Sequence, residues 1–153
     1  MSATVPSHPS AQASYQVRFD WGTAGAAALA DADLLVWVDQ LGAQSAPAHP
    51  GVETALVDDA ERIGDLVLRR QEERGDRVSI AVVAAGEPGE SGALRFAVED
   101  LLAAGAIIDR LADLGIDHCS PEAAAAGAAY GGLRNATRHL ISASVTSRLA
   151  RLA

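Results

Sequence analysis

Carboxylates follow two apolar segments of this chain, at positions where they can meet and bind a metal ion. Asp39 comes directly after the apolar run LLVWV, and Glu87 comes shortly after RVSIAVVAA. If both runs are neighbouring parallel strands, their carboxyl ends share the edge of the sheet at which α/β proteins bind ligands. Carboxylate oxygens are the hard ligands that Mg²⁺ prefers. Asp39 and Glu87 are therefore the first two candidate ligands of a magnesium site.

A second pair of acids, Glu99 and Asp100, follows early in the next alanine- and leucine-rich segment. Adjacent residues of a helix point about 100° apart, so we expect only one of the two to face the strand ends. The other is then expected to be a surface or capping charge. The facing member, Asp100 or Glu99, would complete a set of three carboxylates around one cleft.

The turn between these acids, GEPGESG, is rich in glycine. Gly86 and Gly89 can let backbone N–H groups approach an anion closely, and Arg95 can add a bidentate contact to a phosphate. These three residues are the candidate substrate-binding groups. The same composition is also ordinary for a surface turn, and acids near a helix start are ordinary partners of its dipole. The pattern alone leaves both interpretations open.

The elements that must position these groups alternate between strand and helix. Strands are predicted at 15–19, 34–38, 53–57 and 77–85, and helices after residue 22, over 59–74, from about 94 to 114, from 121 onward and within 135–151. Alternation of this kind indicates an α/β domain. We expect three layers, in which helices flank a small, mainly parallel sheet, plus a C-terminal helical segment.

Three local predictions accompany this fold. Residues 1–14, rich in Ser, Pro and Ala, are expected to be a disordered tail, which leaves 15–153 as a single domain. Thr23 is the candidate N-cap of the first helix. Gly105 is a weak point in the helix predicted from about 94 to 114, because glycine disfavours helix interiors.

Composition and charge exclude several classes of protein. The 153 residues are 49% hydrophobic and carry a formal net charge of −8. An acidic chain is not expected to bind nucleic acid or to adhere to anionic membranes. No apolar run reaches the roughly 18 residues that a membrane-spanning helix needs. The single cysteine, Cys119, and an N-terminus without a signal-peptide pattern predict a cytoplasmic protein.

Two long segments carry a recognisable pattern. YQVRFDWGTAGAAALADADLLVWVDQL contains F-D-W-G, an alanine-rich helix and an apolar strand that ends in an aspartate. VSIAVVAAGEPGESGALRFAVEDLLAAGAII contains a strand, an A-A-G-E turn and an E-D-L-L-x-A-G-A-I helix, and SPEAAAA follows later. In these features the chain resembles the 2-phosphosulfolactate phosphatase family in its actinobacterial form.

The resemblance implies a Mg²⁺-dependent phosphatase that hydrolyses the phosphate ester of a small sulfonated or carboxylated 2-hydroxy acid. On the matching positions it implies that Asp39 and Glu87 bind the metal. Glu99 or Asp100 would be a further ligand or the general base towards a water. Two family features lack counterparts. DQLGAQSAPAHPG replaces a Thr/Ser-rich turn, and the middle region with an S-P-N-G-S-like phosphate loop is missing or shortened.

These departures leave a second hypothesis, a catalytically degenerate relative that acts as a small-anion-binding or protein-interaction scaffold. A third hypothesis, an unrelated nucleotide-binding domain, finds little support because no G-x-G-x-x-G or P-loop follows a strand. Exposed alanine-rich helices beside a small sheet also predict a homodimer.

Overall fold

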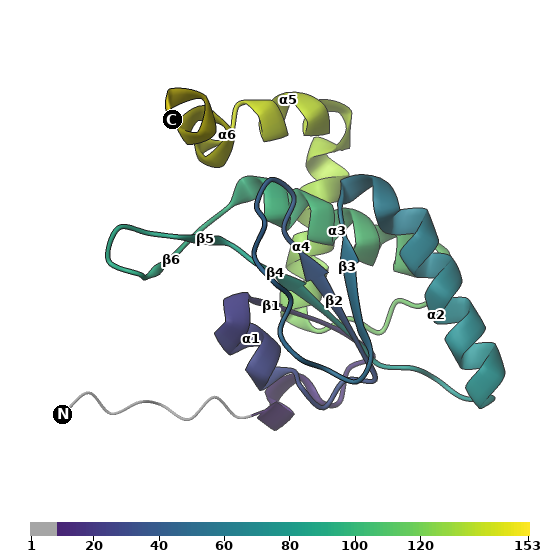
Figure 1. The fold of residues 1–153 in the computed structure, drawn as a ribbon. Helices are drawn as coiled ribbons and strands as arrows, with labels where there is room; N and C mark the ends of the chain where they lie inside the picture. The colour runs from purple at the N-terminus through teal and green to yellow at the C-terminus, as the bar shows by residue number, and fades with distance from the viewer. Residues whose placement is uncertain (1–8) are drawn as a thin grey trace.

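The computed structural model describes residues 9–153, which form an α/β fold around a four-stranded sheet (Figure 1). The strands lie in the order β1-β4-β2-β3, and each neighbouring pair is parallel. Their bounds are Val17–Trp21 (β1), Leu34–Val38 (β2), Val52–Ala55 (β3) and Ile80–Ala84 (β4). The predicted fold class is confirmed.

Helices cover both faces of the sheet and give it three layers (Figure 1). Helix α1 (Gly22–Ala28) packs on one face, against β1 and β4. The layer on the other face consists of α2 (Ala60–Arg74), α3 (Val98–Asp113) and α4 (Pro121–Leu133). The sheet is therefore covered unequally, by one short helix on one side and by three longer helices on the other.

The central strands β2 and β4 are apolar throughout because both of their faces are covered. Every residue of these two strands is buried, as expected inside a parallel sheet. Val36 packs in the larger core together with α2, α3 and α4, whereas Leu35 and Trp37 pack in the smaller core with α1. Alternate residues of one strand thus supply two separate cores.

Shorter elements connect and extend these layers. The 3₁₀ helices are η1 (Pro9–Gln12), η2 (Val57–Asp59) and η3 (Arg134–Ala136). A hairpin of β5 (Glu87–Pro88) and β6 (Leu94–Arg95) lies between β4 and α3. The chain continues after η3 as α5 (Thr137–Ser142) and α6 (Val145–Leu152), in the predicted C-terminal helical segment. Within residues 9–153, no helix combines the length and the apolar character needed to cross a membrane.

Part of the segment predicted to be a tail, residues 9–12, lies against the sheet. Residues 9–12 form η1, and the Gln12 side chain is buried against β1. Its amide donates to the carbonyl of Phe19 at 3.0 Å, and its carbonyl oxygen accepts the N–H of Phe19 at 3.1 Å. These bonds satisfy both backbone groups of a residue in the edge strand and hold Gln12 against β1. Residues 1–8 lie outside the described part of the chain.

Two helix starts also differ from the prediction. Helix α1 begins at Gly22, so the cap position falls on Trp21, which makes no side-chain capping bond, and the Thr23 prediction is wrong. Helix α3 begins at Val98 and not near residue 94, because residues 94–95 pair with β5 in the hairpin.

Gly105 does not interrupt α3, because it is the point where α3 and α4 touch. It is buried, and a Cβ at this position would collide with the carbonyl oxygen of Ala126 and lie 2.8 Å from the Cβ of Tyr130. The absence of a side chain therefore allows close approach of two helices. This contact outweighs the low helix propensity of glycine.

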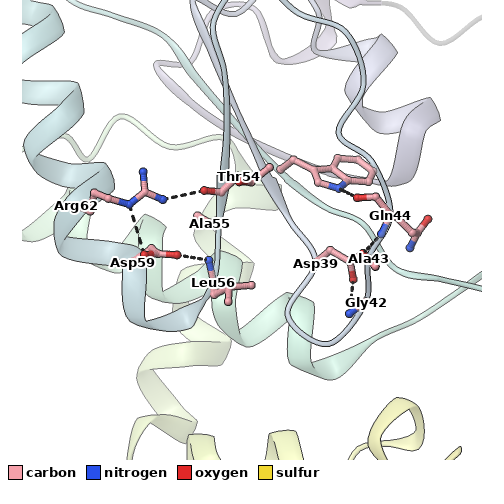
Figure 2. Close-up of a pocket in the computed structure, with 10 residues that line it drawn as sticks. Asp39, Gly42, Ala43, Gln44, Thr54, Ala55, Leu56, Asp59 and Arg62 are labelled. Atoms are coloured by element: carbon pink, nitrogen blue, oxygen red, sulfur yellow. Dashed lines mark hydrogen bonds and ion pairs between the residues drawn. The ribbon is translucent and has the colours of Figure 1, made fainter. Parts of the chain in front are cut away.

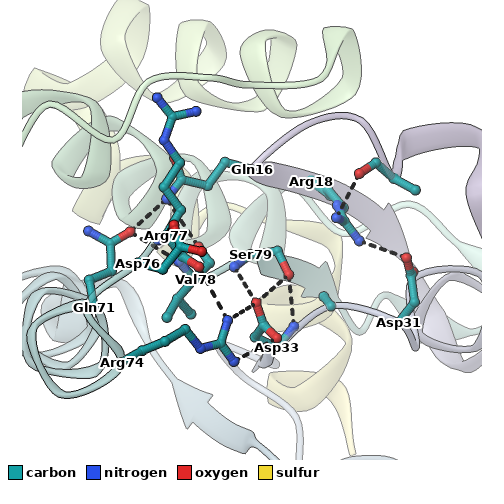
Figure 3. A network of polar contacts seen from close by, with 12 residues as sticks. Gln16, Arg18, Asp31, Asp33, Gln71, Arg74, Asp76, Arg77, Val78 and Ser79 are labelled. Carbon is teal, nitrogen blue, oxygen red and sulfur yellow. Dashed lines mark hydrogen bonds and ion pairs between the residues drawn. The ribbon is translucent and has the colours of Figure 1, made fainter.

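A network of ion pairs and hydrogen bonds lies at the edge of the sheet where the strands begin (Figure 3). Arg74 donates two hydrogen bonds of 2.8 and 2.9 Å to Asp33, and Ser79 donates to the same carboxylate through its N–H and its hydroxyl. The bonds from Arg74 and Ser79 hold the pKa of Asp33 well below its usual range. Because Asp33 and Ser79 directly precede β2 and β4, this network lies at the edge opposite to Asp39 and Glu87.

Candidate metal centre

Three of the predicted carboxylates come together at the carboxyl edge of the sheet. One oxygen each from Asp39, Glu87 and Asp100 lie within 4.8 Å of one another. Asp39 follows β2, Glu87 opens β5 shortly after β4, and Asp100 lies in the first turn of α3. Strands β2 and β4 are hydrogen-bonded neighbours with Val38 opposite Ala84. The chain therefore leaves both strands at the same place, which brings the two acids together.

The loop that follows Asp39 fixes its carboxylate. Oδ1 accepts the N–H of Gly42 at 3.0 Å, and Oδ2 accepts the N–H of Gln44 at 2.8 Å (Figure 2). A Cβ on Gly42 would collide with the carboxylate, so glycine at this position lets Asp39 keep this conformation. The indole N–H of Trp37 donates to the carbonyl of Gln44 at 3.2 Å and ties the loop back to β2.

Asp100 connects the start of α3 to the ends of both central strands. Its Oδ1 accepts the N–H of Gln40 at 2.7 Å, and its Oδ2 accepts the N–H of Gly86 at 2.9 Å. The side chain is fully buried, and burial raises the pKa of Asp100 to about 7. The charges of Asp39 and Glu99 also raise this pKa, whereas the two N–H donors lower it. Asp100 is thus the member of its pair that faces the strand ends.

Glu87 is the most accessible of the three carboxylates and is half-buried. Burial raises the pKa of Glu87, the charges of Asp39 and Glu99 raise it further, and Arg95 lowers it. Its Oε1 is buried without a hydrogen-bond partner among the described residues. A buried carboxylate oxygen without a donor is costly, so the chemistry of this atom suits contact with a proton or a cation.

Glu99 is not the surface or capping charge that was predicted for the second acid. It is 1% exposed, and neither of its carboxylate oxygens has a hydrogen-bond partner within residues 9–153. Helix α3 contacts β2, β4, η2 and α5, so side chains that point about 100° apart in its first turn are both covered. The charge of Glu99 raises the pKa of both Glu87 and Asp100, which places it beside the three-carboxylate cluster.

The glycine turn uses its own N–H groups inside the protein. Gly86 donates to Asp100, and Gly89 donates to the carbonyl of Ala93 at 2.6 Å, which closes the β5–β6 hairpin. Position 86 favours glycine, because the backbone there has a φ of +66° and a Cβ would press against the side chain of Leu94. The two N–H groups predicted to face an anion are therefore already occupied.

Arg95 lies directly opposite Glu87 in the hairpin. Its charge lowers the pKa of Glu87, but its Nη2 donates to the hydroxyl of Thr146 in α6 at 2.9 Å. The role visible in the structure is a link between the hairpin and the C-terminal segment. A contact between Arg95 and a substrate remains a prediction.

A cavity of about 420 Å³ opens beside Asp39, with Arg62 of α2 on the opposite wall (Figure 2). Arg62 forms ion pairs with Glu53 at 3.2 Å and with Asp59 at 3.4 Å. It is the one cation among the residues that line this cavity, and it was not among the residues predicted from the sequence. The sequence offers only one reason to select Arg62, which is that it lies in the helix that follows the third strand. Ligands bind beyond the carboxyl ends of parallel strands.

The donor set fits a divalent cation. Neighbouring carboxylates repel one another unless a proton or a cation lies between them, and the buried oxygens of Glu87 and Glu99 lack donors among the described residues. Mg²⁺ takes hard oxygen ligands and retains several waters. Asp39, Glu87 and Asp100 would hold such an ion, with Glu99 adjacent.

Comparison with known proteins assigns no family to this arrangement. No protein-family model matches the chain, and a search of curated proteins finds no significant match.

Proposed function

We propose that this chain is a Mg²⁺-dependent phosphatase of small phosphorylated 2-hydroxy acids, a shortened relative of the 2-phosphosulfolactate phosphatase family. The observation that carries the proposal is the approach of Asp39, Glu87 and Asp100 to within 4.8 Å at the carboxyl edge of a parallel sheet. The sequence resemblance supports it, because the A-A-G-E and E-D-L-L patterns contain Glu87, Glu99 and Asp100.

The four acids at the carboxyl edge of the sheet have separate roles in this reaction. Asp39, Glu87 and Asp100 would hold the cation, which would supply positive charge to offset the charge developing on the phosphoryl oxygens. Glu99 is the general base, because neither of its oxygens is engaged by a donor among the described residues. It takes a proton from the attacking water while the water oxygen bonds to phosphorus. The ester P–O bond breaks, and the leaving alkoxide takes its proton from solvent.

The cavity beside Asp39 accommodates the organic part of the substrate in this proposal. Arg62 faces Asp39 across it and would bind the carboxylate or sulfonate of the substrate. The ion pairs of Arg62 with Glu53 and Asp59 join exposed or half-exposed side chains. Such pairs contribute little free energy, so a substrate anion can replace them at small cost.

One observation favours a second function, a scaffold that carries out no turnover. The N–H groups of Gly42 and Gln44 are bonded to Asp39, and those of Gly86 and Gly89 are bonded to Asp100 and Ala93. None of these four groups is available to position a phosphoryl group, on which phosphoryl transfer depends.

Two measurements on the full chain separate these functions. Calorimetric titration with MgCl₂ tests cation binding, and release of inorganic phosphate from small phosphate monoesters, with and without Mg²⁺, tests the reaction. Glu87→Gln removes a ligand whose Oε1 has no partner in the described structure. Glu90→Gln is the matched control, since Glu90 is exposed on the same hairpin loop.

We expect Glu87→Gln to lose both cation binding and phosphate release, and Glu90→Gln to keep both. Mg²⁺ binding without phosphate release from any ester would support the scaffold. Failure of the wild-type chain to bind Mg²⁺ would overturn the metal centre, and phosphate release that persists without Mg²⁺ and in Glu87→Gln would indicate a contaminant.

A further inference from the structure

An aromatic groove lies on the surface near the β5–β6 hairpin, independently of the proposed metal centre. It has a volume of about 310 Å³, and the rings of Phe19, Trp21 and Phe96 contribute to its wall together with the acids Asp20 and Glu122. The ring centroids of Trp21 and Phe96 are 5.4 Å apart, and those of Phe19 and Trp21 are 5.7 Å apart. Phe96 is nevertheless 60% exposed. The groove is thus an apolar surface with negative charge at its border.

Helix α6 has the complementary surface. Val145, Leu149 and Leu152 follow the i, i+4, i+7 spacing of one helical face, and all three are more than half exposed, at 55%, 54% and 83%. Arg148 and Arg151 lie beside this apolar stripe at 100° per residue. The helix therefore presents an apolar stripe with positive charge along one side.

The two surfaces differ in charge because acids and arginines are unequally distributed along the chain. Residues 123–153 contain four arginines and no aspartate or glutamate, whereas the whole chain has a net charge of −8. A basic helix and an acidic groove attract each other. Each of the two surfaces also carries exposed apolar side chains that docking would remove from water.

The geometry points to a second copy of the chain as the partner. Thr146 accepts a hydrogen bond from Arg95 of its own hairpin, and Phe96 of the groove is the next residue in the chain, so α6 is tied to the segment that leads into the groove. The apolar stripe points about 100° away from Thr146 around the helix. We propose that α6 of each protomer docks in the aromatic groove of the other, as a symmetric homodimer.

Sedimentation equilibrium of the full chain over a micromolar concentration range tests this dimer. Arg148→Glu and Glu122→Arg should each weaken dimerisation by at least about tenfold, because like charges then face each other. The double variant restores opposite charges and should recover most of the affinity. Leu149→Ser should abolish the dimer. Arg69→Glu, which makes the same charge change at an exposed site on α2, should have no effect.

Each variant is expected to fold, because Arg148, Glu122 and Leu149 are exposed, and circular dichroism is the check. A wild-type chain that is monomeric at every concentration overturns the proposal. This outcome includes the case in which α6 folds onto the groove of its own chain. A dimer that is unaffected by Arg148→Glu and Leu149→Ser also overturns it, because the interface then lies elsewhere.

Discussion

The carboxylate of Asp100 accepts the N–H of Gly86 at 2.9 Å, and this bond joins the first turn of α3 to the turn that follows β4. The other oxygen of Asp100 accepts the N–H of Gln40, directly after Asp39. One buried acid therefore holds the two strand-end loops from which the other candidate ligands come. Structure and proposed chemistry depend on the same side chain.

The metal-free protein should be less stable at alkaline than at mildly acidic pH. Asp100 has its pKa raised from 3.8 to about 7 in the folded state, so the folded state binds this proton more tightly than the unfolded state does. Between these two values the free energy of unfolding falls as pH rises. We expect a loss of about 1–4 kcal/mol from Asp100, measured by urea unfolding in EDTA near pH 5 and pH 8.

Asp100→Asn controls for the other titrating groups. The difference between the two pH values should shrink in this variant, even though the loss of one accepted N–H bond lowers its stability throughout. An equal difference in wild type and variant would show that Asp100 ionises normally.

Glu99→Gln should stabilise the protein in EDTA. The substitution removes a buried charge without donors among the described residues, together with its repulsion of Glu87 and Asp100. We expect the free energy of unfolding to rise by about 1–3 kcal/mol, and phosphate release to be lost. Glu72→Gln, exposed on α2, should change neither quantity. A less stable Glu99→Gln would mean that the carboxylate has a stabilising partner.

Gly105→Ala should loosen the contact between α3 and α4. The added methyl group meets the backbone of Ala126, and overpacking of this kind costs about 1–3 kcal/mol. Gly131→Ala, in α4, meets no atom within 4 Å and should gain about 0.5–1 kcal/mol through helix propensity. Thermal unfolding of both variants makes the comparison. If both substitutions change the unfolding temperature equally, helix propensity and not packing determines the effect of an alanine at position 105.

Arg62→Gln tests the cavity as the place of the substrate. If Arg62 binds the acid group in both the ground state and the transition state, its loss should raise KM about tenfold with little change in kcat. Arg69→Gln, exposed on the same helix, should leave both constants unchanged. A normal KM in Arg62→Gln would place the substrate outside this cavity.

The sequence was sufficient to find the central strands and the acids that follow them. LLVWV and IAVVA are recognisable because a strand buried on both faces is apolar at every position. Asp39 and Glu87 could be selected from their place after such runs, since ligands bind beyond the carboxyl ends of parallel strands. The helix predicted from 121 onward is α4, and the Ser120 side chain accepts the N–H of Ala123 at its start.

Contacts between distant segments were decided only by the tertiary structure. The position of β4 between β1 and β2 brings Glu87 to Asp39, and no local pattern encodes which strands pair. Glu99 looks like an ordinary helix-start charge until the surrounding elements cover it, and the N–H groups of Gly86 and Gly89 look free until their partners are known. Sequence patterns report how each residue meets its near neighbours, whereas burial and hydrogen bonding at a site depend on the elements that fold around it.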